Sequence, residues 1–113
     1  MEITFKAEEI YVADKAVDFR AGINSLCAVV VEYMQKEPSK GVYVFYNKTR
    51  DRLKVLGWHR NGFIMICKRL ESGKFFIRAG DDLQINSEQL TWLLMGVDWK
   101  ILSGGECNIN AYF

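Results

Sequence analysis

Proline, histidine and cysteine are all scarce in this chain of 113 residues, and each scarcity argues against a class of protein. A single proline and the lack of any low-complexity tract argue against a disordered chain. The one histidine and three cysteines (Cys27, Cys67 and Cys107) are too far apart in the sequence, without any Cys-x-x-Cys pair, for the four closely paired ligands of a structural zinc site. Three is also the wrong number for a disulfide framework. We therefore expect no metal, no cofactor and reduced, mostly buried thiols.

Long apolar runs are missing as well. None approaches the roughly 18 residues that a membrane-spanning helix requires. The first six residues lack the basic start and apolar core of a signal peptide. A chain of this length can bury about two thirds of its unfolded surface around one core. We expect a soluble, cytoplasmic protein with one domain, 1–113, that makes no membrane contact.

The middle of the chain has the pattern of a β-sheet. Four runs there are rich in valine, isoleucine and aromatic residues, and short polar linkers separate them. They lie at 42–46, 52–58, 63–70 and 75–78. Such runs predict consecutive antiparallel hairpins. Shorter runs, Ile10 to Ala13 and Leu83 to Asn86, add candidate strands, the first at an edge of the meander. Apolar residues throughout 63–67 favour a central strand covered on both faces.

Two stretches space their apolar side chains by three or four residues, as a helix with one buried face requires. The first begins after Asp18, a predicted N-cap, and ends before Pro38. The second begins at Asn86, where Gln89 approximates a capping box, and stops at Gly96. Together these elements predict an α+β domain, an antiparallel β-meander of four to five strands with two helices. The order of the C-terminal tail, 103–113, stays open.

Charge is divided unevenly along the chain. Between Val42 and Arg78 nine basic residues outnumber two acidic ones, a local charge of +7, while the remainder carries −6 and brings the total to +1. A basic face of this kind suits a phosphate-bearing partner. Eight of these residues are candidates for binding nucleic acid. They are Lys48, Arg50, Arg52, Lys54, Arg60, Lys68, Arg69 and Lys74.

The four candidates between positions 48 and 54 alternate, so an extended backbone places them on one side. Four cations in a row, with Tyr46 and Trp58 nearby, suit the tracking of a phosphate backbone without reading of bases. Basic residues also keep an edge strand soluble and balance the acidic remainder of a protein. The pattern alone leaves both interpretations open.

Residues for catalysis do not cluster in the sequence. His59 falls at a predicted hairpin tip beside Arg60, without the pocket or orienting partner that a general base needs, so we expect an exposed turn histidine. Cys67 stands next to Lys68, but its position in a strand favours a buried structural thiol. The acidic residues are scattered along the chain. We expect that the protein is not an enzyme.

An ordered set of short motifs covers most of the chain. It consists of Trp58, Asn61-Gly-Phe63, Lys68-Arg-Leu-Glu71 followed by Gly73, and Asp98-Trp99. At these spacings the region from about residue 10 to 99 resembles the accessory protein of bacterial transposable elements of the insertion sequence sixty-six family, the product of their second open reading frame, also called TnpB. Members of that family usually carry an Arg-Gly-Arg-Arg-like run where this chain has Tyr46-Asn-Lys-Thr49.

The resemblance implies a non-catalytic helper in DNA transposition and recombination, which acts beside a separate transposase of the same element. Two hypotheses follow. In the first, the basic face contacts element DNA or the transposase nucleoprotein complex. In the second, the chain is a protein–protein adaptor that binds the transposase or a second copy of itself, without touching DNA.

Overall fold

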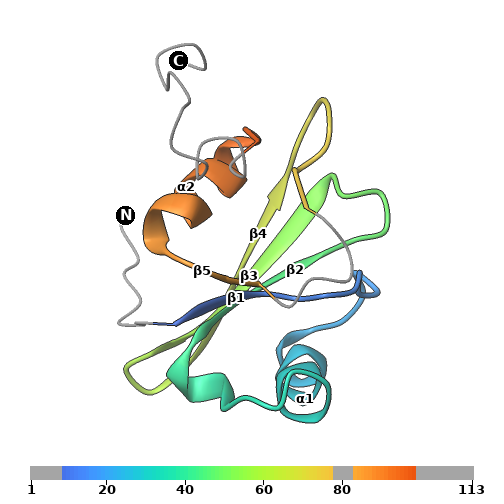
Figure 1. Cartoon of the computed structure of the whole chain (residues 1–113). Helices are drawn as coiled ribbons and strands as arrows, with labels where there is room; N and C mark the ends of the chain where they lie inside the picture. The colour runs from blue at the N-terminus through green and yellow to red at the C-terminus, as the bar shows by residue number, and fades with distance from the viewer. Residues whose placement is uncertain (1–8, 78–82, 99–113) are drawn as a thin grey trace.

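A mixed β-sheet with one α-helix on each face forms the centre of the computed structural model, which describes residues 9–77 and 83–98 (Figure 1). The strands of this part of the chain are β1 (Ile10–Val12), β2 (Val42–Tyr46), β3 (Arg52–His59), β4 (Gly62–Arg69) and β5 (Leu83–Ile85). The helices are α1 (Ile23–Glu32) and α2 (Ser87–Met95), and a 3₁₀ turn, η1 (Pro38–Lys40), precedes β2. The α+β class is therefore confirmed.

The strand order, β4-β3-β2-β1-β5, corrects the expected meander. Strands β2, β3 and β4 do form the predicted antiparallel hairpins. However, β1 pairs with β2 in parallel, and β5 then adds to β1 in antiparallel orientation. The parallel pair exists because the chain leaves β1 and returns through α1, and a helical crossover lets two neighbouring strands run the same way. The sheet is therefore mixed.

The strand predicted at 75–78 is wrong for the residues that the structure describes. Residues 75–77 belong to no strand, and Arg78 lies outside the described ranges. Phe75 and Ile77 are nevertheless buried, and the Phe75 amide donates a hydrogen bond to the Arg50 carbonyl (2.7 Å). The loop thus packs the side chains of Phe75 and Ile77 into the core and bonds to the β2–β3 turn. Buried side chains at alternate positions gave the sequence the pattern of a strand, although no neighbouring strand pairs with it.

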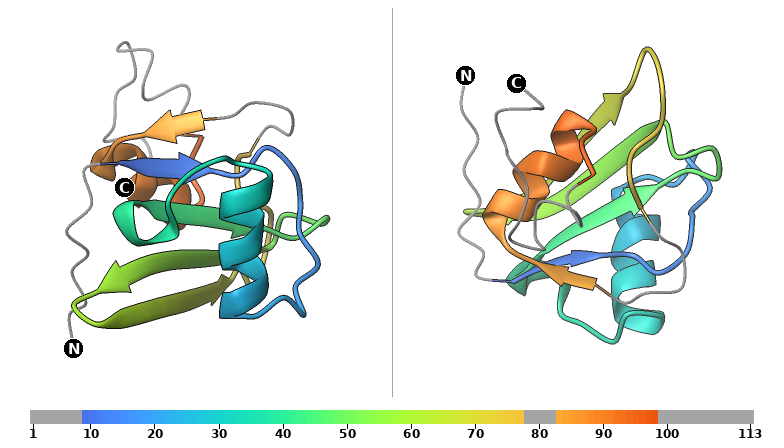
Figure 2. Two further views of the ribbon diagram at one scale, coloured as in Figure 1. Left: turned by 90° about the horizontal axis from the view of Figure 1, so that it is seen from below. Right: turned by 45° about the horizontal axis from the view of Figure 1, so that its top comes forward.

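The core lies on both faces of β2, the middle strand. All five β2 residues are buried, and α1 and α2 cover opposite faces of the sheet (Figures 1 and 2). Leu26 and Val30 of α1 and Leu93 of α2 are fully buried. The run expected to be central, 63–67, instead belongs to β4 at the edge, where the second half of the strand is exposed. Its apolar character therefore does not come from cover on both faces.

The first helix is shorter than predicted at both ends. Asp18 is not its N-cap, because it accepts hydrogen bonds from the backbone amide and guanidinium of Arg20 in a turn before the helix. Gly22 is the N-cap, without a side-chain capping bond. At the other end Tyr33 caps the helix and Gln35 adopts a left-handed backbone (φ 56°), so α1 stops well before Pro38.

The second helix confirms its predicted ends. The Gln89 amide donates to the Asn86 side chain (2.8 Å), and the Asn86 amide donates to the Gln89 side chain (2.9 Å), which makes a complete capping box. Gly96 closes the helix in the left-handed conformation (φ 79°) that favours glycine. Neither this helix nor any other described one is long and apolar enough to cross a membrane. The tail, 103–113, lies outside the described residues.

The capping box gives a first test of the fold. Replacing Asn86 with alanine leaves the Gln89 amide without its acceptor, so we expect a loss of about 1 kcal/mol in the free energy of unfolding. Urea denaturation followed by circular dichroism measures it. Ser87→Ala, one position further on in the same exposed turn, is the matched control and should change stability by less than about 0.5 kcal/mol. Equal losses in the two variants would contradict the capping role.

Candidate nucleic-acid interface

The turn between β2 and β3 is held by Asn47 and Asp51. The Asn47 side-chain oxygen accepts from the amides of Asp51 and Arg52 (3.1 Å each), and its NH₂ group donates to the Asp51 carboxylate (2.7 Å). Thr49 donates to the same carboxylate (2.7 Å). These bonds organise the turn, in which Arg50 adopts a left-handed backbone (φ 58°). The turn therefore has a fixed shape that presents the exposed Lys48 and the half-buried Arg50.

The register of β3 against β4 brings two arginines together. Arg52 lies directly opposite Arg69, and two positions further along Lys54 lies opposite Cys67. Opposed residues of an antiparallel pair share a face, and alternate residues return to it, so all four belong to one face. Like charges that face each other across a ladder repel. The pair Arg52–Arg69 is therefore a local concentration of positive charge.

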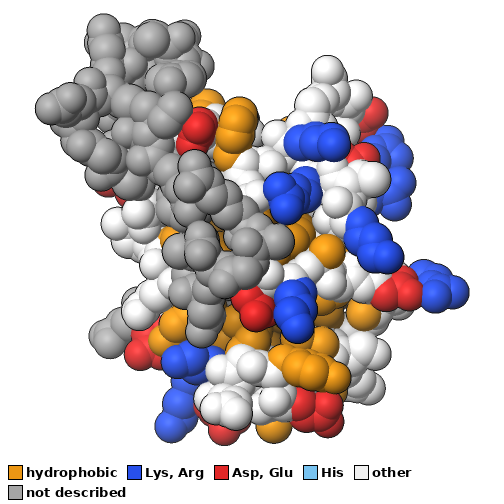
Figure 3. All heavy atoms as spheres, turned by 45° about the vertical axis from the view of Figure 1, so that its right-hand side comes forward, with side chains coloured by type: hydrophobic (Ala, Val, Ile, Leu, Met, Phe, Trp, Pro, Cys, Tyr) orange, Lys and Arg blue, Asp and Glu red, His pale blue; other side chains and the backbone are white. Residues whose placement is uncertain are grey.

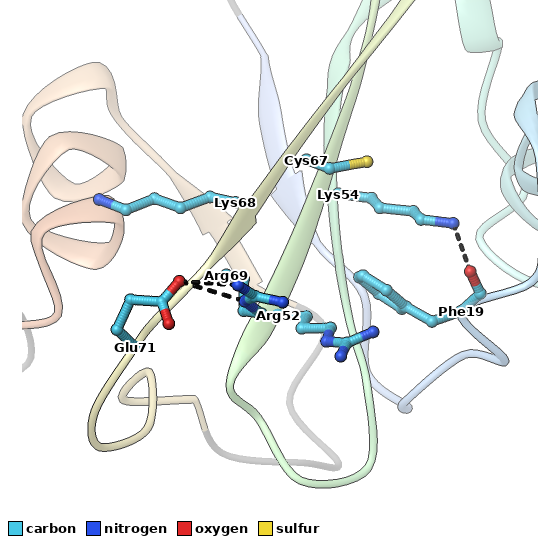
Figure 4. A pocket seen from close by; sticks show the side chains of 7 residues that line it. All are labelled: Phe19, Arg52, Lys54, Cys67, Lys68, Arg69 and Glu71. Carbon is cyan, nitrogen blue, oxygen red and sulfur yellow. Dashed lines mark hydrogen bonds and ion pairs between the residues drawn. The ribbon is translucent and has the colours of Figure 1, made fainter.

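A hollow of about 500 Å³ lies over this face at the open end of the β3–β4 pair (Figure 4). Its lining residues come from the segment before α1, from β3, from β4 and from the loop after β4. They are Phe19, Arg52, Lys54, Cys67, Lys68, Arg69 and Glu71. Arg69 forms an ion pair with Glu71 (2.9 Å) in which both side chains remain largely exposed, at 60% and 81%. An exposed pair of this kind is weak and leaves the guanidinium available to a stronger anion.

Lys54 is the buried cation of the group, with a residue exposure of 6%. Its ammonium donates to the carbonyl oxygens of Phe19 and Ala21, both at 2.7 Å, and lies 4.5 Å from the centre of the Phe19 ring (Figure 4). The side chain thus ties the segment before α1 to β3. Its first contribution is to the fold of the site, and the other arginines and lysines are better placed to meet a ligand.

Lys68 borders the hollow by its place between Cys67 and Arg69, but its side chain is directed to the opposite face of β4. It points toward α2 in Figure 4 and donates to the carbonyl oxygen of Leu94 in the last turn of that helix. A cation there offsets the negative end of the helix dipole and one of its free carbonyls. Lys68 therefore helps to attach α2 to the sheet.

The remaining candidates separate into two groups. Leu70 and Phe75 bond through their amides to the carbonyls of Asp51 and Arg50, which holds the loop after β4 against the β2–β3 turn. This arrangement gathers five of the predicted residues, which we call the basic end. The basic end consists of Lys48, Arg50, Arg52, Arg69 and Lys74.

Arg60 stands apart from the basic end. It occupies the β3–β4 hairpin tip, eight residues from Arg52 along an extended strand, or roughly 27 Å. Figure 3 shows Lys and Arg side chains gathered along one side of the molecule, with carboxylates between them. The sequence pattern thus placed five of its eight candidates together, and it missed Phe19, Cys67 and Glu71, which line the hollow. The alternation of charge carried no signal for these three residues.

Other side chains with possible chemistry stay isolated. Cys67 is exposed rather than buried as expected, Cys27 is half-buried, and burial raises the pKa of the Cys27 thiol. His59 ends β3 and is half-buried instead of fully exposed. Within residues 9–77 and 83–98 no three His, Cys, Asp or Glu side chains come close enough to hold a metal ion. That the protein binds no metal or cofactor stays a prediction.

The sequence matches known proteins over most of its length. The family described as IS66 Orf2 like protein matches residues 8–103. Two relatives are from Sinorhizobium fredii (strain NBRC 101917 / NGR234). The uncharacterized protein y4jC is 40% identical over 93 residues, 80% of this chain and 80% of the relative. The uncharacterized protein y4hO is 32% identical over 94 residues, 80% of this chain and 82% of the relative. No solved structure matches the chain.

The anchoring role of Lys54 is testable by stability. Lys54→Met keeps the length and apolar part of the side chain but removes the donor to Phe19 and Ala21. We expect a loss of about 1–3 kcal/mol in the free energy of unfolding, because two carbonyls lose a charged partner. Arg52→Met, two positions away on the same face but exposed, is the control and should cost less than about 0.5 kcal/mol. A Lys54 variant as stable as the control would contradict this role.

The turn carboxylate predicts an acid-dependent stability. Hydrogen bonds from Asn47 and Thr49 lower the pKa of Asp51 below its ordinary value. A lowered native pKa means that the contribution is complete above the unfolded pKa of about 3.9 and is lost as the pH falls through the native pKa. Urea midpoints at pH 6 and pH 3 should therefore differ more for the natural chain than for Asp51→Asn. Arg20 also lowers the pKa of Asp18, but Asp18 contributes equally to the pH dependence of the natural chain and of Asp51→Asn. Equal differences would contradict the assignment.

Proposed function

Because this chain belongs to the family of IS66 Orf2-like proteins, we propose that it is a non-catalytic accessory factor in DNA transposition that contacts DNA through its basic end. The family is an accessory one and is not known as a catalytic family. Contact with DNA, and through it with the nucleoprotein complex of the element's transposase, goes beyond what family membership establishes. It is supported by the arrangement of charge at the basic end.

The observation that carries the proposal is the opposed pair Arg52–Arg69 at the mouth of the hollow. Two like charges across one ladder position cost free energy in the isolated protein. A phosphate between the two guanidinium groups would remove this repulsion and accept hydrogen bonds from both, because the planar fork of arginine matches phosphate geometry. Glu71 occupies part of this role in the free protein. DNA would displace that exposed carboxylate at little cost.

The elements that form the basic end suit contact with the phosphate backbone of DNA rather than recognition of base edges. Its cations come from the turn 47–51, from two strand ends and from a loop rather than from a helix, the element that most often reads bases in the major groove. Asn47, a residue type that often reads adenine, is occupied by bonds within its own turn. We therefore propose binding through phosphates, with little sequence preference and a strong dependence on salt.

A second candidate is the adaptor, which would bind the transposase without DNA. It is favoured by apolar side chains that remain exposed on the β3–β4 hairpin, Trp58 at 37% on one face and Ile66 at 39% on the other. Exposed aromatic and aliphatic side chains are often found at protein interfaces. Copurification with the element's transposase after nuclease treatment would support this candidate.

The DNA proposal is tested by fluorescence anisotropy with generic duplex and single-stranded DNA at several salt concentrations. We expect salt-steep binding in which the logarithm of affinity falls by about 0.9 per phosphate contact for each logarithmic unit of salt on duplex. Changing Arg52 and Arg69 together to glutamine should weaken duplex binding roughly tenfold or more and reduce the salt slope by about two contacts. The control changes Lys40 and Arg60 to glutamine, which removes two charges at the other end of the sheet. Equal weakening by both double variants would contradict the assignment to the basic end.

Cys67 supplies an independent readout in the same samples, because it is exposed and lines the hollow. Bound DNA should slow its alkylation by iodoacetamide, measured on the Cys67 peptide by mass spectrometry. The protection should disappear at high salt and in the Arg52→Gln/Arg69→Gln variant. DNA binding without any slowing at Cys67 would mean that the contact lies elsewhere on the protein.

A further inference from the structure

Strand β4 offers one free edge. Within the described residues it pairs with β3 alone and ends the sheet. At the open end of the β3–β4 pair the Leu70 amide donates to the Asp51 carbonyl (2.8 Å), and hydrogen-bonded pairs alternate with non-bonded ones along an antiparallel ladder. The amides and carbonyls of residues 63, 65, 67 and 69 therefore point away from β3. These groups form a template for another strand.

The middle of this edge lacks the usual protection against pairing. Edge strands are commonly guarded by central charges, proline or a bulge. The residues from Phe63 to Cys67 include none of these, and Ile66 is 39% exposed on a strand of eight residues. Charge appears only at the end of the strand, at Lys68 and Arg69. The edge is therefore apolar at its centre and basic at one end.

We propose that β4 is a self-association interface, where a second copy of this chain adds its own β4 in antiparallel orientation around Met65. In this register Met65 lies opposite Met65 of the second copy, Ile64 opposite Ile66, and Phe63 opposite Cys67. The sheet continues across the two-fold axis, with each helical layer meeting its equivalent. The proposal is independent of DNA binding.

The distribution of side chains along β4 favours a second copy as the occupant. Pairing around Met65 sets apolar residues against apolar residues and places the exposed Ile66 opposite Ile64 of the second copy. It places Lys68 opposite Gly62 and Arg69 opposite Asn61, so no cation faces another. Continued beyond the strands, the register brings Glu71 next to the His59–Arg60 tip of the other copy, a complementary charge pair.

The neighbouring symmetric register is less favourable. Pairing around Ile66 would set Lys68 opposite Ile64 and Arg69 opposite Phe63, so each of these cations would lie against an apolar side chain of the second copy. Because a shift of this kind changes every opposed pair, the register itself can be tested.

Self-association would also change the basic surface. A two-fold axis perpendicular to the sheet keeps both hollows on one side of the dimer. The two Arg69 residues would then lie eight residues apart along the strand direction, roughly 27 Å. This consequence rests on the proposed function, since it matters only if the hollows hold phosphates.

Sedimentation velocity of the full chain without DNA, from low to high micromolar concentration, is the first test. We expect a reversible dimer. Cys67→Pro should abolish it, because proline removes an outward amide that bonds to Phe63 of the second copy twice per dimer, while leaving the β3–β4 bonds intact. Cys67→Ser, which keeps the amide, should dimerise as the natural chain does. Circular dichroism checks that both variants fold.

A chain that stays monomeric at every concentration would overturn the proposal, as would a Cys67→Pro variant that folds and still dimerises. The register is tested in the Cys67→Ser background by mixing Ile64→Cys with Ile66→Cys under mild oxidation. We expect a disulfide between the cysteine introduced at position 64 of one variant chain and the cysteine introduced at position 66 of the other. This test does not depend on whether the protein tolerates proline at position 67. A disulfide that forms only between two Ile66→Cys chains would overturn the register around Met65. Since no DNA is present, these outcomes are separate from the fate of the DNA proposal.

Discussion

The register of β3 decides most of what this molecule can do. Its side chains alternate between two covered faces, so Leu53 and Val55 pack on one side of the sheet while Arg52 and Lys54 lie on the other. A slip of one residue would exchange the faces and bury a charged side chain against α2. The same register sets Arg52 opposite Arg69 and brings Lys54 to the segment before α1. The register of β3 therefore determines both which of its side chains enter the core and which cations meet at the basic end.

The site depends on the core through Lys54. A buried ammonium is tolerated only where its protons are bonded, and here the carbonyls of Phe19 and Ala21 accept two of them while the Phe19 ring covers the charge. This connection fixes Phe19 at the wall of the hollow. Lys54 and Lys68 thus serve structure through bonds to backbone carbonyls, whereas the cations of the basic end remain available to a partner. Basic residues that look alike in the sequence therefore have different roles.

Local signals in the sequence were sufficient for much of the fold. The runs at 42–46 and 52–58, the short strands near Ile10 and Leu83, and the capping box at Asn86 all depend on neighbours in the chain, and the structure confirms them. The parallel pairing of β1 and the loop at 75–77 depend on contacts between distant segments, which composition does not reveal. Asp18 resembled an N-cap, but Arg20 provided a closer partner.

The candidate site was predictable to a similar degree. Alternation correctly placed Arg52 and Lys54 on one face, but it contained no information about depth, so it did not separate the exposed arginine from the buried lysine. Lys48 and Arg50 belong to a turn, where the rule of alternation does not apply. The approach of Arg69 to Arg52 required the pairing of β4, and Glu71 followed from it. The basic end is thus a product of register rather than of spacing.

The surface that meets DNA can be located by titrating the isotope-labelled chain with a short duplex and following the amide chemical shifts. We predict shifts concentrated at residues 47–52, 67–70 and 74–75, and unchanged amides at the β3–β4 tip and in η1. Shifts centred on the tip at Arg60, or spread evenly over the surface, would contradict the claim that the basic end is the surface that meets DNA.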